Sequence, residues 1–247
     1  MKTERVAILS DIHGNLEALQ AVMDDLWRRR CDRIFCLGDT VGYGPHPAEC
    51  LTIARERFAL VLQGNHEHGL IHGAENFNPV AKEALEWCRR QVADPALVAF
   101  LRTLRPAKLD GRTLFVHASA RDPLQDYVRE ITGRDSFEAL VESIKDEFTR
   151  FDLCFVGHNH KAFLGTTDGL LYPHDEVTRF SVEGQKMYVC VGSVGQPRDN
   201  DTRACYVLFD GESVEYHRVA YDVEKTARDI LQAGLPEFLA ERLYIGK

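Results

Sequence analysis

The stretch Gly64-Asn65-His66-Glu67-His68 carries an amide, two imidazoles and a carboxylate directly after the apolar run Phe58–Leu62. The run has the length of a buried strand in a parallel sheet, and the glycine after it indicates a loop. An Asn or a His in a polar loop is also an ordinary surface residue, so the stretch alone does not establish a site. Whether the stretch forms a functional site depends on which residues follow the other predicted strands.

The first half of the chain alternates short apolar runs with helical patterns. The apolar runs are Val6–Leu9, Ile34–Leu37 and Phe58–Leu62. Between the first two runs, spacings of three and four define an apolar helical face, formed by Leu16, Leu19, Val22, Met23 and Leu26. This alternation predicts βαβ units and a parallel sheet that is covered on both faces.

The second half of the chain changes to an antiparallel pattern. After a helical region from Pro79 to Leu104, interrupted near Pro95, Asp110-Gly111 predicts a hairpin turn. Asp135 or Ser136 is placed to begin a helix that runs to about Arg150. The expected strands are Ala107–Leu109, Thr113–Val116, Leu153–Val156, Met187–Val191, Cys205–Phe209 and Val214–Val219, and a last helix runs from Asp222 to Ala233. We predict an α/β fold with two sheets and flanking helices in one domain, residues 1–247, with residues 222–247 as its C-terminal helical tail.

Composition narrows the possible functions. The formal net charge of −8 argues against binding nucleic-acid polymers, which prefer basic surfaces. No segment approaches about 18 consecutive apolar residues, so no membrane span is expected. The N-terminus lacks the apolar region of a signal peptide, which predicts a cytoplasmic protein. The seven Cys form no Cys-x-x-Cys pair and are expected to be reduced and buried.

Five polar loops follow apolar runs, and the C-terminal ends of strands in an α/β sheet are where ligands gather. We therefore expect their side chains to converge. The candidate metal ligands are Asp11, His13, Asp39, Asn65, His117, His158 and His160.

The donor types of this set indicate a centre of two metal ions. Carboxylates, imidazoles and an amide oxygen suit zinc, manganese or iron. Seven donors exceed what one tetrahedral ion needs and match two ions that share a carboxylate, for which Asp39 is the natural bridge. Two divalent ions held mostly by neutral ligands keep a small positive charge, which suits an anionic phosphate.

Taken together, these motifs resemble those of the calcineurin-like metallophosphoesterases over roughly residues 5 to 220. The motifs are Asp11-x-His13, Gly38-Asp39, Gly64-Asn65-His66-Glu67, His117 and Gly157-His158-x-His160. The resemblance implies a four-layer αββα sandwich of two stacked mixed sheets. It also implies one metal held by Asp11, His13, Asp39 and His160, and another held by Asp39, Asn65, His117 and His158. His66 matches the family histidine that protonates the leaving group and is not a ligand.

The segments Gly38–Gly44 and Gly192–Arg198 are most similar to the small prokaryotic branch of this family. That branch includes phosphodiesterase-like and diadenosine-polyphosphatase-like members. The Ser/Thr protein phosphatases carry Asp-Arg-Gly where this chain has Gly42-Tyr43-Gly44. The carboxylate that would orient His66 is missing from that position, which argues against a protein phosphatase.

The resemblance implies hydrolysis of a small phosphate mono- or diester by a metal-bridging hydroxide, with nucleotides and dinucleoside polyphosphates among the candidate substrates. Arg198 is a candidate phosphate-binding residue. A surface ion pair with Asp199 or Asp201 would explain Arg198 equally well.

A non-catalytic metal-containing scaffold or regulatory module of the same fold is the alternative function. The presence of His66 favours an enzyme, because a scaffold needs no proton donor. The sequence does not distinguish a monomer from a homodimer. It also does not decide whether residues 78–104 or 121–150 form a cap over the site.

Overall fold

The computed structural model describes residues 4–126, 150–166, 169–173, 175, 177–184 and 186–247. Within these residues the strands form two mixed sheets, ordered β3-β2-β1-β11-β12-β9 and β4-β5-β6-β10-β7-β8. The first contains β1 (Val6–Leu9), β2 (Arg33–Cys36), β3 (Leu60–Val61), β9 (Val177–Ser181), β11 (Ala204–Phe209) and β12 (Ser213–Val219). The second contains β4 (Ala107–Asp110), β5 (Thr113–Val116), β6 (Leu153–Val156), β7 (Ala162–Thr166), β8 (Gly169–Leu171) and β10 (Met187–Val191).

Each sheet contains a block of parallel strands. In the first sheet β1 pairs in parallel with β2, and β2 with β3. In the second sheet β6 pairs in parallel with β5 and with β10. The remaining neighbours are antiparallel, as in the β11–β12 pair. Because parallel strands end at the same edge, the loops after these two blocks can meet at one place.

Strand β1 shows why both faces of the first sheet are buried. Its side chains alternate between the two faces, as in any strand. Val6 and Ile8 belong to the core between the sheets, together with Phe155 of the second sheet. Ala7 and Leu9 belong to the core under α1 (Leu16–Arg28). The uninterrupted apolar run therefore reflects a strand that is covered on both sides.

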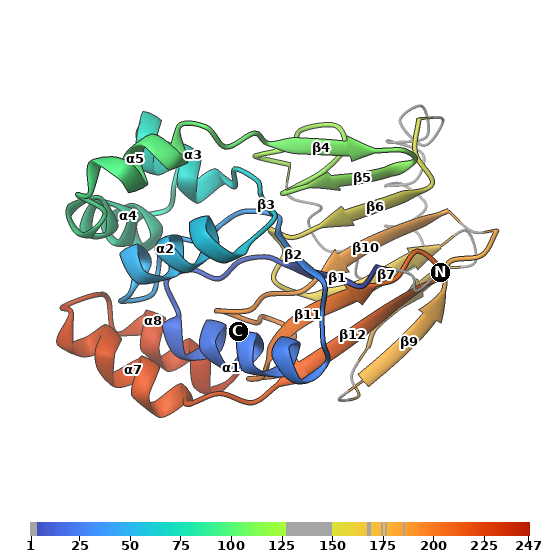
Figure 1. Ribbon diagram of the computed structural model, residues 1–247. Coiled ribbons are helices and arrows are strands. Elements are labelled where there is room, and N and C mark those ends of the chain that lie inside the picture. The colour runs from blue at the N-terminus through green and yellow to red at the C-terminus, as the bar shows by residue number, and fades with distance from the viewer. Residues whose placement is uncertain (1–3, 127–149, 167–168, 174, 176, 185) are drawn as a thin grey trace.

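The described helices lie over the first sheet and at one end of the sandwich (Figure 1). Helices α2 (Pro47–Arg57), α3 (Asn65–His72), α4 (Pro79–Gln91) and α5 (Pro95–Leu101) share one apolar cluster, which includes Leu51, Leu70, Leu85 and Leu101. Helices α7 (Val223–Gln232) and α8 (Phe238–Glu241), followed by the 3₁₀ turn η2 (Arg242–Tyr244), pack on α4 through a second cluster. Residues of α7, α8 and η2 thus share a cluster with Ala81 and Ala84 of α4.

The predicted α/β fold of two mixed sheets flanked by helices is confirmed. The two helices on either side of Pro95, the hairpin at Asp110-Gly111 and the last helix also form as predicted. Helix α7 begins where expected because the Asp222 side chain accepts a hydrogen bond from Lys225 N. The predicted helix from Asp135 to Arg150 lies outside the described residues, except for Arg150 itself.

Three sequence predictions need correction. The expected strand Phe58–Leu62 shortens to Leu60–Val61, because Phe58 still ends α2. The expected loop after Gly64 is a helix instead, with Gly64 as the N-cap of α3. Strands β7, β8 and β9 had no sequence assignment. They are short segments whose strand structure depends on pairing with distant partners such as β10 and β12.

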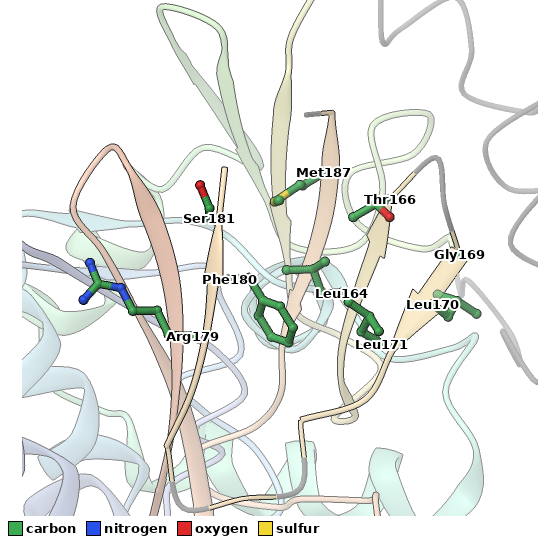
Figure 2. A pocket seen from close by; sticks show the side chains of 9 residues that line it. All are labelled: Leu164, Thr166, Gly169, Leu170, Leu171, Arg179, Phe180, Ser181 and Met187. Carbon is green, nitrogen blue, oxygen red and sulfur yellow. The ribbon is translucent and has the colours of Figure 1, made fainter. Parts of the chain in front are cut away.

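A pocket of about 410 Å³ opens between the sheets at the end away from the loop after β10 (Figure 2). Figure 2 shows Phe180 of β9 and Leu164 of β7 facing one another across it. Arg179 and Ser181 form its rim on the β9 side. This pocket is distinct from the polar site described below.

Two predictions from composition can be compared with the structure. All seven Cys are free thiols and six of them are buried, as predicted. Among the described residues, no helix combines the length and the apolar character that crossing a bilayer requires.

Candidate metal centre

The candidate ligands lie on loops that leave the parallel strands of both sheets. Asp11, Asp39 and Asn65 follow β1, β2 and β3, whereas His117 and His158 follow β5 and β6. All seven predicted ligands are buried: Asp11, His13, Asp39, Asn65, His117, His158 and His160.

The backbone at this site is unusually strained. Among the described residues, eight non-glycine residues have a positive φ, and six belong to the site: Asp11, His13, Asp39, Tyr43, His158 and His160. A left-handed backbone costs L-residues roughly 1–3 kcal/mol each and is retained where the surroundings enforce it, often at functional sites. The strain turns these side chains toward a common centre.

Two imidazoles of the centre face each other through their Nε2 atoms. His13 Nδ1 lies 3.0 Å from the carbonyl oxygen of Val41, and His160 Nδ1 lies 2.6 Å from that of Gln196. A carbonyl can only accept, so both Nδ1 atoms donate and both Nε2 atoms point to the centre. Those two Nε2 atoms are 3.1 Å apart. A divalent cation or a shared proton beside them removes the repulsion between their lone pairs.

Carboxylates complete this first cluster. Asp11 Oδ1 is 3.2 Å from His160 Nε2, and Asp39 Oδ2 is 3.7 Å from His13 Nε2. Backbone N–H groups orient both carboxylates through the opposite oxygen. Asp11 Oδ2 accepts from His158 N and Asp39 Oδ1 accepts from His66 N, each at 2.9 Å. The remaining oxygen of each Asp is thereby directed to the imidazoles.

A second cluster surrounds His117 Nε2. This atom lies 3.1 Å from Asn65 Oδ1, 3.1 Å from His158 Nδ1 and 3.3 Å from Asp39 Oδ2. Asp39 thus belongs to both clusters, and Asp11, His13 and His160 lie only in the first. The groups of side chains that could hold a metal ion are Asp11 with His13 and His160, Asp39 with His13 and His66, and Asp39 with His117 and His158.

The donor set fits divalent metal ions. The first cluster offers two converging imidazole nitrogens and a buried oxygen, Asp11 Oδ1, that accepts no hydrogen bond from the described residues. Carboxylate and imidazole ligands held by backbone partners are typical of zinc, manganese or iron sites. The donor types present therefore fit a divalent metal ion.

Without a metal, the charges of the centre depend on Asp39 and His117. Burial would raise the pKa of Asp39, but His117 and His66 lower it below its ordinary value. Burial would lower the pKa of His117, but Asp39 and Asp11 raise it to about 9. Burial lowers the pKa of His158 to about 4. In the metal-free protein these shifts favour an ion pair between His117 and Asp39.

Glu67 is a residue whose role sequence reasoning underestimated. It is fully buried and accepts four backbone hydrogen bonds at 2.7–3.2 Å, from the N–H groups of Asp39, Thr40, Val41 and Gly64. Glu67 ties the loop after β2 to the first turn of α3. Burial and the nearby Asp39 charge raise the pKa of Glu67 to about 7 in the metal-free protein, although its N–H donors act in the opposite direction. The spacing Gly64-x-x-Glu67 was the available signal, because an acidic residue at the third helical position caps a helix.

His66 lies in the first turn of α3, beside both carboxylate loops. Its ring is 4.6 Å from the rings of His13 and Tyr43, centroid to centroid. A methyl group added at Gly42 would lie 2.1 Å from His66 Nδ1, so only glycine fits there. Gly42 is the position where the protein phosphatases carry Asp. His66 Nδ1 is buried without a hydrogen-bond partner among the described residues.

Arg198 lies at the same edge of the sheets. Its backbone N–H donates to the carbonyl of His160, and its guanidinium lies 5.8 Å from the ring centroid of Tyr43. Asp199, the ion-pair partner considered from sequence, instead contacts the buried Arg218. Asp201 pairs with Arg203 at 2.7 Å. The Arg198 side chain donates to Gln196 Oε1.

Comparisons with known proteins agree with this geometry. A calcineurin-like phosphoesterase superfamily domain matches residues 5–213. The chain is 36% identical over 256 residues to an uncharacterised protein of Methanocaldococcus jannaschii, MJ0912, with all of both chains covered. It is 34% identical to a metallophosphoesterase from Sphaerobacter thermophilus, with a TM-score of 0.86 over 99% of this chain and 100% of that chain. A putative diadenosine tetraphosphatase shares the fold at 17% identity and a TM-score of 0.51, over 88% of this chain and 95% of that chain.

The fold and the converging Asp and His side chains define an α/β protein with a candidate metal centre. The domain match over residues 5–213 identifies the family. The chain belongs to the calcineurin-like phosphoesterase superfamily, as its motifs predicted.

Proposed function

We propose that this protein is a metal-dependent phosphoesterase that hydrolyses a small phosphate mono- or diester. The observation that carries the proposal is the convergence of the Nε2 atoms of His13 and His160, 3.1 Å apart, beside the Asp11 carboxylate. Buried imidazole and carboxylate donors that converge in this way suit a divalent cation. This convergence therefore supports a site built for metal and not a structural cluster of histidines.

The residues divide into two sets of candidate ligands. Asp11, His13, Asp39 and His160 would hold one ion, and Asp39, Asn65, His117 and His158 would hold the other. When bound, two divalent ions supply positive charge for the phosphate and lower the pKa of coordinated water toward neutrality. Manganese, iron and zinc all suit these donors.

His66 is the proposed proton donor to the leaving oxygen. Burial lowers the pKa of His66 well below its ordinary value, and the neighbouring His13 acts in the same direction, whereas Asp39 raises it. A bound phosphate would add negative charge beside the ring and move the pKa of His66 upward, toward the protonated form. Proton donation of this kind contributes about 10²–10⁴-fold to the rate.

Arg198 is the proposed phosphate-binding cation of the protein itself. Its loop follows β10 and is tied to His160, which keeps the guanidinium next to the candidate metal centre. A guanidinium binds two phosphate oxygens at once, and its charge would stabilise the anionic transition state.

Hydrolysis of p-nitrophenyl phosphate and bis(p-nitrophenyl) phosphate with added Mn²⁺ tests the proposal. We expect the wild-type protein to hydrolyse these esters. The His66→Asn variant should hydrolyse an alkyl ester with a kcat at least 100-fold lower, and its metal content should be unchanged. His72→Asn, an exposed histidine of the same helix, is the matched control and should behave like the wild type.

The scaffold alternative predicts a different result. Mn²⁺ would then raise the melting temperature, but no phosphate ester would be hydrolysed with Mn²⁺, Fe²⁺ or Zn²⁺. Unchanged turnover of alkyl esters by His66→Asn would leave a phosphoesterase but remove His66 from the proton-donor role.

A further inference from the structure

A cavity of about 320 Å³ lies directly beside His66, between α3 and α4. This volume is in the range of sites that bind small molecules. Its lining consists of Tyr43, Asn65, His66, Asn76, Phe77, Asn78, Ala81 and Gln125. It touches Asn65 of the candidate centre and the proposed proton donor. If His66 protonates the leaving oxygen, a group in this cavity lies on the leaving-group side of the phosphate.

Aromatic rings form part of the cavity wall. The Phe77 ring stands perpendicular to that of His66, with centroids 5.2 Å apart and an interplanar angle of 89°. Tyr43 contacts the same imidazole at 4.6 Å. Phe77 and Tyr43 therefore flank the proposed proton donor and offer apolar faces to a planar group.

Amide side chains supply the polar part of the wall. Asn76, Asn78 and Gln125 line the cavity, and their side chains offer both hydrogen-bond donors and acceptors. The Asn78 amide oxygen accepts from Ala81 N at the start of α4, which fixes the orientation of this amide. Within the described part of the chain, no Asp, Glu, Lys or Arg lines the cavity.

The charged residue Arg198 and the uncharged cavity lining both adjoin Tyr43. Arg198 lies 5.8 Å from the Tyr43 ring centroid and is not among the residues that line the cavity. The cation and the candidate metal ligands suit the phosphate, whereas the cavity suits an uncharged group with a flat face and hydrogen-bonding edges. A nucleobase has both properties, because it stacks on aromatic rings and is read by amide side chains along its edge.

We propose that this cavity binds the nucleoside part of a nucleotide substrate and places its departing ribose oxygen next to His66. The inference rests on the proposed phosphoesterase function and names its substrate class. For adenosine 5′-monophosphate, the oxygen of water forms a bond to phosphorus and the bond to the ribose oxygen breaks. The ribose oxygen takes a proton from the His66 imidazolium, and the proton that the attacking water loses restores this imidazolium. The products are adenosine and inorganic phosphate.

Adenosine 5′-monophosphate and ribose 5-phosphate form a matched pair of probes, because they differ only in the base. Calorimetric titration of the Mn²⁺-loaded protein, with His66→Asn as a turnover-deficient version, measures both affinities. We expect adenosine 5′-monophosphate to bind at least tenfold more tightly. Equal affinities would overturn the inference.

Substitutions of lining residues test whether the preference for adenosine 5′-monophosphate over ribose 5-phosphate arises in this cavity. Phe77→Leu keeps an apolar side chain but removes the aromatic face, and Gln125→Glu adds a charge. Each should reduce the ratio of the two affinities at least threefold. Gln20→Glu, the same change at an exposed position of α1, should leave the ratio unchanged. A ratio that survives both lining variants would place the base elsewhere and overturn the inference.

The titration separates this inference from the proposed function, because binding needs no turnover. A tenfold preference in a protein that hydrolyses no ester would support the nucleoside site and contradict the phosphoesterase. Hydrolysis of both probes with equal kcat/KM would support the phosphoesterase and contradict the nucleoside site.

Discussion

At the scale of single residues, the site depends on how each donor is oriented by a backbone group. The carbonyl oxygens of Val41 and Gln196 fix the tautomers of His13 and His160. Asp11 and Asp39 are each oriented by one backbone N–H group. Partners of this kind typically matter 10–100-fold for metal affinity. The candidate ligands therefore depend on the surrounding backbone groups for their orientation.

Glu67→Gln tests how much the hydrogen bonds between Glu67 and the surrounding backbone stabilise the site. Gln keeps one acceptor oxygen and turns an NH₂ group toward two backbone donors that Glu67 now satisfies. We expect the free energy of unfolding to fall by about 2–4 kcal/mol and Mn²⁺ affinity to fall about tenfold or more. Chemical denaturation and metal titration measure the two effects.

Glu86→Gln, on the exposed face of α4, is the control for Glu67→Gln and should be nearly neutral. If Glu67→Gln were as stable as this control and bound Mn²⁺ normally, Glu67 would have no supporting role.

At the scale of elements, the loops after the strands interlock so closely that side chains are excluded. A methyl group at Gly64 would lie 2.1 Å from Asp39 Oδ1, and one at Gly42 would lie 2.1 Å from His66 Nδ1. The loop after β2 thus packs against the start of α3 at two points, one touching a ligand and the other the proposed proton donor. This contact sets the position of His66 relative to Asp39.

Gly42→Ala should displace the His66 ring without removing any candidate ligand. Because a displacement of about 1 Å can cost about 10²-fold in rate, we expect kcat to fall about 100-fold while metal content stays the same. Steady-state kinetics and elemental analysis check the two parts.

Gly111→Ala is the control for Gly42→Ala, because it adds backbone strain without a steric clash. Gly111 also has a positive φ, of 58°, but a methyl group there would meet open space. This variant should lose about 1 kcal/mol of stability and keep its kcat. Wild-type turnover by Gly42→Ala would show that the loop contact does not position His66.

At the scale of the whole molecule, the candidate centre connects the two sheets, because its candidate ligands come from loops of both. Asp39 follows β2 of the first sheet and His117 follows β5 of the second. Metal binding, or the His117–Asp39 ion pair in its place, therefore joins the two halves of the sandwich.

The stability of the metal-free protein should depend on pH through His117. Its folded pKa of about 9 lies above the ordinary value of 6.5. The stabilisation is thus complete below pH 6.5 and is lost as the pH rises through about 9. In EDTA we expect the free energy of unfolding to fall by about 2 kcal/mol between pH 7 and pH 9.

With Mn²⁺ bound, this loss should be absent, because a metal-bound imidazole carries no extra proton. The stabilisation by Mn²⁺ should accordingly grow with pH, as melting curves at each pH would show. His117→Gln in EDTA should not show the decrease. Equal stability of the EDTA-treated wild type at pH 7 and pH 9 would contradict the assigned ion pair.

Much of this site was predictable, because the relevant information is local. The run Val6–Leu9 followed by Asp11 and His13 indicates a buried strand with polar groups at its end. Parallel strands end at one edge, so the convergence of the ligands followed from strand order. Segments such as β9 were not predicted, because its alternating exposed residues become a strand only by pairing with β12.

The sequence by itself determined the kinds of donor, their order along the chain, the family and the two-sheet architecture. Only the tertiary structure decided that two imidazole nitrogens face each other, that Glu67 is fully buried and that a cavity lined by uncharged residues of the described chain adjoins His66. The physical reason is that residue type and spacing are properties of the chain. The direction of a lone pair depends on which distant backbone groups pack beside the ring.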